Sequence, residues 1–151
     1  MELLYGPMER TRRGRIPTYR DFYAEVAEEL PTMLPKDLRD YQTQRMGGVF
    51  KVFYDDRRQH FELWFRDGGL EVAFHLEGRP EDDEAVLRVL ERRLQAIRKQ
   101  LGGDVRLEPF GRDWTHLYEH WRGASRQPEL ASEAAERLAE FVRAIEPLRR
   151  S

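Results

Sequence analysis

Two His-x-Glu patterns lie close together in the sequence, His60 with Glu62 and His75 with Glu77. Each lies in a segment where apolar and polar residues alternate, which predicts a β-strand. Directly opposed residues on adjacent antiparallel strands have Cβ atoms about 5 Å apart. If these two strands pair, the four side chains share one face and could bind a divalent metal ion, because such ions accept mixed nitrogen and oxygen ligands.

The chemistry of this face has three interpretations. A surface that binds a small molecule or a protein partner would use His60, Glu62, Trp64, Glu71, His75 and Glu77. A metal-dependent hydrolase would use the two His-x-Glu pairs, with a histidine as general base. A structural ladder would stabilise the hairpin by roughly a few tenths of a kcal/mol per pair. Because the sequence shows neither the burial nor the cleft of an active site, we expect a non-catalytic binding module with no catalytic residue.

A second pair of histidines, His116 and His120, stands four residues apart. On a helix this spacing would direct both imidazoles to one metal ion. On a strand the two residues would lie about 13 Å apart and could not bind the same ion. No glutamate follows the first histidine directly, so we interpret this pair as structural.

The first two patterns belong to a predicted β-hairpin over residues 60–77. Its other face is apolar and comprises Phe61, Leu63, Phe65, Val72, Phe74 and Leu76. The turn is either Gly68-Gly69, which places Glu62 opposite His75, or Asp67-Gly68, which places His60 opposite His75. Both registers keep the same residues on each face, so the face assignment does not depend on the turn.

The remaining segments predict a single α+β domain over residues 1–151. Residues 17–45 are expected to be helical, with one helix after Thr18 and a short one from Pro35. The sheet region covers 49–121 and contains a long helix over 80–101, and a last helix covers 128–147. Residues 113–121 fit a strand or a helix, and we favour a strand because Gly111-Arg112-Asp113 resembles a hairpin turn. We expect an antiparallel sheet of about four to five strands with helices mainly on one face.

Composition restricts the classes of function. The net charge is −2 and the pI is near 6.1, which disfavours a nucleic-acid binder. Accessory proteins of nucleic-acid metabolism stay an alternative because residues 1–16 are rich in arginine. The chain has no cysteine, which excludes disulfides and thiolate-ligated zinc. We find no membrane span and no signal peptide, so we expect a cytoplasmic protein. The sequence requires no cofactor, and a divalent metal ion at the two His-x-Glu pairs is the alternative.

A resemblance covers roughly residues 49–148. The patterns HFELW and LEVAFHLE, followed by LGG and VRLEPFGR, are similar to a group of uncharacterised bacterial proteins whose centres read like HYEVW and LEIGLHFE. No activity is assigned to that group, so the resemblance implies a shared pattern and no particular chemistry.

We further expect that the binding module forms a homodimer or a larger homo-oligomer.

Overall fold

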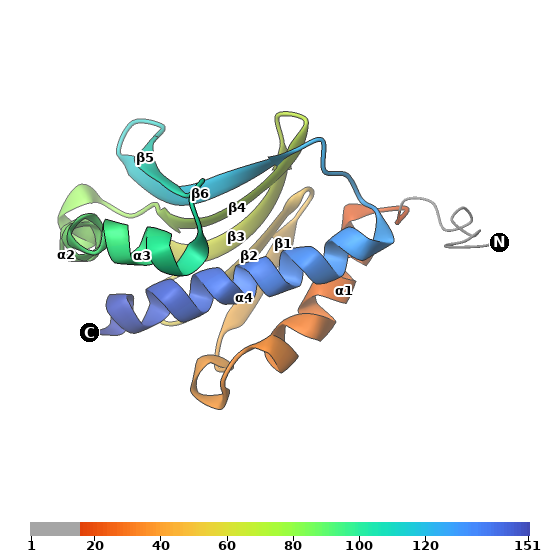
Figure 1. Ribbon diagram of the computed structural model, residues 1–151, viewed down its shortest axis with the longest axis horizontal. Coiled ribbons are helices and arrows are strands. Elements are labelled where there is room, and N and C mark those ends of the chain that lie inside the picture. The colour runs from red at the N-terminus through yellow and green to blue at the C-terminus, as the bar shows by residue number, and fades with distance from the viewer. Residues whose placement is uncertain (1–15) are drawn as a thin grey trace.

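The computed structural model describes residues 16–151 of the chain (Figure 1). The predicted arginine-rich segment 1–16 therefore lies outside the described residues, except for Ile16. The described part contains helices and one antiparallel sheet, which confirms the α+β class.

The central hairpin consists of β3 (Gln59–Arg66) and β4 (Gly69–Leu76). Its turn is Asp67-Gly68, with φ angles of 52° and 71°, respectively. Positive φ at both positions is the geometry that matches the twist of a two-residue hairpin. His60 therefore lies opposite His75, which is the second of the two registers considered.

The sheet has six strands in the order β1-β2-β3-β4-β6-β5, one or two more than expected. They include β2 (Val49–Phe53), β5 (Arg106–Phe110) and β6 (Trp114–Arg122), so the segment expected over 113–121 is a strand, as favoured, and begins at Trp114. The additional strand is β1 (Gln42–Met46), at the end of the segment expected to be helical. Its sequence, QTQRM, lacks the alternation of apolar and polar residues that identifies a half-buried strand.

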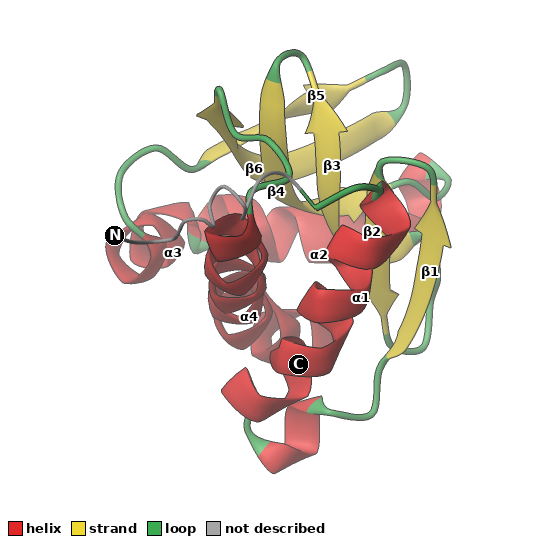
Figure 2. Cartoon of the chain, turned by 90° about the vertical axis from the view of Figure 1, so that its right-hand side faces the viewer, coloured by secondary structure: helices red, strands yellow, loops and turns green. Residues whose placement is uncertain are grey.

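Helices cover one face of this sheet (Figures 1 and 2). The helix α1 (Tyr19–Glu29) begins at Thr18, whose hydroxyl accepts from the Asp21 backbone N–H, and it packs beside α4 (Pro128–Arg150). Two short 3-10 turns follow α1, at Leu30–Met33 and Lys36–Leu38. The apolar face of the hairpin, with Phe61, Leu63 and Val72, packs against these helices.

The expected long helix over 80–101 is two helices, α2 (Pro80–Arg92) and α3 (Leu94–Leu101). The chain leaves helical geometry at Arg93, where φ is −103° and ψ is 11°. Both segments contact α4, and the break lets Leu90 and Ile97 each bury their side chains. The last helix also extends beyond Pro147, its expected end, because Arg149 and Arg150 both bind the buried Glu146.

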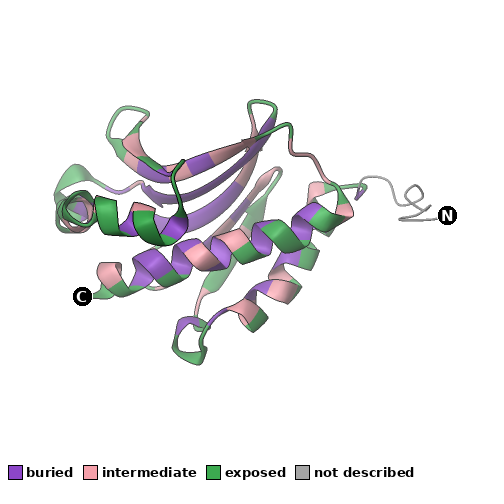
Figure 3. Ribbon diagram, viewed as in Figure 1, coloured by how far each residue is buried: buried purple, intermediate pink, exposed green. Residues whose placement is uncertain are grey.

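Burial continues through the sheet to the face that carries no helix. Every residue of β4 is buried, although alternate residues point to opposite faces (Figure 3). The first five residues of β3 are buried as well. None of the helices in residues 16–151 is long and apolar enough to cross a membrane.

Candidate metal centre

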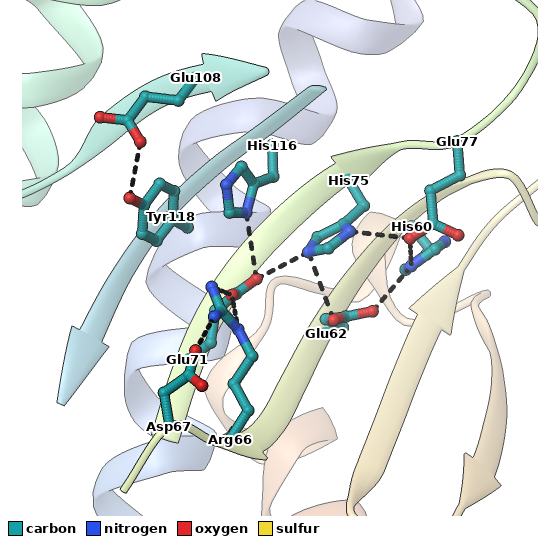
Figure 4. A network of polar contacts seen from close by, with 10 residues as sticks. All are labelled: His60, Glu62, Arg66, Asp67, Glu71, His75, Glu77, Glu108, His116 and Tyr118. Carbon is teal, nitrogen blue, oxygen red and sulfur yellow. Dashed lines mark hydrogen bonds and ion pairs between the residues drawn. The ribbon is translucent and has the colours of Figure 1, made fainter. Parts of the chain in front are cut away.

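Strand alternation gathers the predicted site residues on the face opposite the helices. His60, Glu62 and Trp64 lie on β3, and Glu71 and His75 lie on β4. Glu77 follows directly after β4 and is fixed by a hydrogen bond from its backbone N–H to the Arg58 carbonyl. Figure 4 shows these polar side chains in front of the sheet, with α4 behind it.

This cluster is buried, although the sequence showed no sign of burial on this face. The exposed fraction of the side chain is 1% for His60, 3% for Glu62 and 0% for His75, and Glu77 alone is partly open at 16%. Phe110 of β5 helps to seal it, with its ring centroid 5.0 Å from that of His75. Because a buried charge is poorly solvated, each charged side chain of the cluster needs a neighbour of opposite charge or a hydrogen-bond partner.

His60 is fixed as one tautomer by its surroundings. Its Nδ1 lies 3.0 Å from the Arg57 carbonyl oxygen, which can only accept, so Nδ1 carries a hydrogen. Its Nε2 faces Glu62 Oε1 at 2.9 Å and Glu77 Oε2 at 3.6 Å (Figure 4). Carboxylate oxygens also only accept, so a proton or a metal ion must mediate between Nε2 and these oxygens.

His75 faces carboxylates with both ring nitrogens. Nδ1 lies 2.8 Å from Glu77 Oε2, and Nε2 lies 2.7 Å from Glu71 Oε2 and 3.3 Å from Glu62 Oε2. Burial would lower the pKa of this imidazole, but the hydrogen bonds to Glu71 and Glu77 and the charge of Glu62 outweigh it and raise the pKa to about 9. Without a metal ion, His75 is therefore a buried cation at neutral pH.

Glu71 lies beneath this histidine, with its side chain fully buried. Burial would raise its pKa, but hydrogen bonds from His116, His75 and Arg66 hold the pKa well below its usual range. The guanidinium of Arg66 binds Glu71 Oε1 through Nε at 2.7 Å and Nη2 at 2.5 Å. Glu71 is thus an ionised carboxylate that is already paired with one arginine.

His116 joins the cluster although we interpreted it as structural. On β6 it lies opposite His75, and its Nδ1 is 3.3 Å from Glu71 Oε2. The ring of Tyr118 stacks on His116, and its hydroxyl donates to Glu108 (Figure 4). The only sequence signal for His116 was the alternation within 113–121, which does not reveal that β6 pairs with β4.

Two other predicted residues lie apart from the cluster. His120 directs its Nε2 to the Arg66 carbonyl at 2.9 Å, so it does not act with His116, as expected for a strand. Trp64 is partly exposed, and its ring lies 6.0 Å from Phe110 and 5.1 Å from the guanidinium of Arg66. Trp64 therefore borders the buried cluster without contacting its histidines.

Among residues 16–151, two sets of side chains have the spacing of metal ligands, with donor atoms within 4.8 Å of one another: His60, Glu62, His75 and Glu77, and Glu71, His75 and His116. Tetrahedral zinc, with ligands at about 2.0–2.1 Å, places its donors about 3.3 Å apart. In the first set, neighbouring donors are 2.9 Å apart for His60 and Glu62 and 2.8 Å for His75 and Glu77. The first set therefore needs only small shifts to enclose an ion.

Charge also favours the first set. Glu62, Glu71 and Glu77 carry three negative charges, and Arg66 compensates one of them at Glu71. When the histidines are neutral, as ligation requires, the remaining charge of −2 is neutralised by one divalent cation. In the second set the ion would lie beside Glu71, which Arg66 already neutralises. Glu71 and His116 are better placed as an outer layer that orients His75.

The pKa of His75 predicts how the stability of metal-free protein depends on pH. Because folding raises this pKa from 6.5 to about 9, its contribution is complete below pH 6.5 and is lost as the pH rises to 9. One pKa unit corresponds to about 1.4 kcal/mol, so we expect a loss of roughly 3 kcal/mol. Urea unfolding of chelator-treated protein at several pH values measures this loss of unfolding free energy. The same loss in His75→Gln would contradict this assignment.

The lowered pKa values of Glu71 and Glu77 act in the opposite direction. Their contributions are complete above 4.5, the ordinary value, and are lost as the pH falls through the lowered values. With His75, they place the maximum stability due to this cluster between pH 4.5 and 6.5.

Comparison with known proteins identified no relative of this chain. No protein-family model matches the chain, and neither the curated proteins nor the solved structures contain a match.

Proposed function

We propose that this protein is a non-catalytic small-ligand-binding module whose centre is one divalent metal ion held by His60, Glu62, His75 and Glu77. One observation carries the proposal. Each imidazole has one ring nitrogen bound to a separate acceptor, Arg57 O or Glu71, while the other nitrogen faces a carboxylate of the set. Outer acceptors of this kind fix the tautomer and ring orientation of metal-ligating histidines.

The ligand set also supports a class of metal ion. Two imidazoles and two carboxylates suit zinc and neighbouring transition metals, whereas magnesium and calcium prefer six or more oxygen ligands. Binding is favoured over hydrolysis because His60, Glu62 and His75 are buried, and the partly exposed Glu77 leaves only a narrow approach to the ion. The ion replaces the proton on His75 Nδ1, while Nε2 still donates to Glu71.

Equilibrium dialysis of chelator-treated protein tests this proposal. We expect one zinc ion per chain at micromolar free zinc and no magnesium at the same concentration, because magnesium dehydrates reluctantly and demands oxygen ligands. His120→Ala is the matched control, since this histidine lies on the same face but binds a backbone carbonyl. Equal uptake of magnesium and zinc would contradict the proposed ligand set.

A further inference from the structure

We propose that the metal ion has one exchangeable coordination position, at Glu77, where the module binds a small oxyanion such as a carboxylate. This inference rests on the proposed metal centre and names the class of ligand that the centre takes. It is carried by the unequal way in which the four ligands are held and by the charge of Lys51 beside them.

The two carboxylates of the set differ in their anchoring. Glu62 uses both oxygens, Oε1 toward His60 and Oε2 toward His75, and its side chain is 3% exposed. Glu77 makes its contacts with both histidines through Oε2 alone and is 16% exposed. It also lies beyond the last residue of β4. Both carboxylates contact both histidines, but Glu77 does so through one oxygen at the exposed edge of the cluster, so it is the ligand that can turn outward at least cost.

Turning Glu77 outward leaves His60, Glu62 and His75 on the ion. Three protein ligands, two histidines and one carboxylate, are the arrangement in which metal sites keep a position open for an external ligand. Because the other ligands are sealed, this open position faces solvent only on the side of Glu77. The position is therefore suited to a small group rather than to a bulky substrate.

Charge at this position favours an anion. Lys51 of β2 lies directly opposite Glu62 on the same face of the sheet. Within the described part of the chain, Lys51 has no ion-pair partner. With Glu77 turned outward, the divalent ion, Lys51 and Glu62 together carry a net charge of +2, which favours an anionic ligand.

Cobalt-substituted protein tests this inference, because the visible absorption of Co²⁺ reports its coordination. We expect stoichiometric cobalt binding first, and then a saturable spectral change on titration with sodium acetate. Lys51→Gln should weaken acetate binding by about tenfold, in keeping with the loss of a charge-assisted contact. Lys99→Gln, at an exposed lysine of α3, is the matched control and should bind acetate like the parent. Glu77→Ala should bind acetate more tightly, since the competing carboxylate is gone.

The outcomes separate the two proposals. Stoichiometric cobalt with no spectral response to acetate, in the parent and in Glu77→Ala, would overturn the oxyanion position and leave the metal centre standing. Equal acetate affinity in the parent and Lys51→Gln would overturn the part assigned to Lys51. Absence of cobalt binding would overturn both the metal centre and the inference that rests on it.

Discussion

Replacing Glu71 by alanine is expected to lower the free energy of unfolding at pH 7 by about 3–5 kcal/mol, the cost of breaking a buried ion pair from one side. The substitution leaves the guanidinium of Arg66 without its bidentate partner and leaves the imidazolium of His75 without its shortest contact. Arg66 keeps its ion pair with the exposed Asp67, but the imidazolium of His75 stays fully buried, where a charge that has lost a partner is poorly solvated. Chemical denaturation of metal-free protein measures the difference.

A matched control for this substitution is Glu81→Ala. Glu81 also faces an arginine, Arg79, but the two side chains are 66% and 67% exposed. Exposed pairs typically contribute less than about 1 kcal/mol, so this variant should unfold almost as the parent does. If Glu71→Ala cost no more than Glu81→Ala, the buried charge network described here would be wrong.

The second large effect concerns His75→Ala, which should weaken zinc binding by about 100-fold or more. In the proposed metal centre His75 would supply a ligand atom through Nδ1, and its Nε2 contacts Glu71 of the outer layer. Loss of an outer-layer contact alone costs about 10- to 100-fold in metal affinity, so loss of the ligand should cost at least as much. A competition titration against a chromophoric chelator measures the dissociation constant.

Two further variants help to interpret this titration. His120→Ala should keep the affinity of the parent, because His120 lies outside both candidate sets. His116→Ala should weaken zinc binding by about 10- to 100-fold, as an outer-layer residue does. A complete loss of binding in His116→Ala, with little effect in His60→Ala, would move the ion to the set of Glu71, His75 and His116.

Alternation in the sequence was sufficient to predict the hairpin and the membership of its two faces. Apolar residues such as Phe61 and Phe74 repeat at every second position, and this period places His60 and His75 on the opposite face in either register. The register itself required the backbone geometry of Asp67 and Gly68, because several pairs of turn residues were compatible with the sequence.

Other features depend on contacts between distant segments, which local patterns do not record. The strand β1 has a polar sequence and is a strand because it pairs with β2 at the edge of the sheet. His116 reaches Glu71 only because β6 pairs with β4. Burial of the polar face likewise arises from Phe110 of β5, which packs against His75. The sequence therefore predicted the four side chains of the proposed metal centre and Glu71, but neither their burial nor the contact of His116 with Glu71.

The most direct test of the proposed metal centre is elemental mass spectrometry of untagged protein after incubation with zinc and removal of free metal. The ligand geometry and the charge of −2 left by Glu62, Glu71, Glu77 and Arg66 predict one zinc per chain. The His60→Ala/His75→Ala variant should retain none, and His120→Ala should retain one. Zinc absent from the parent, or present equally in the double variant, would contradict the account.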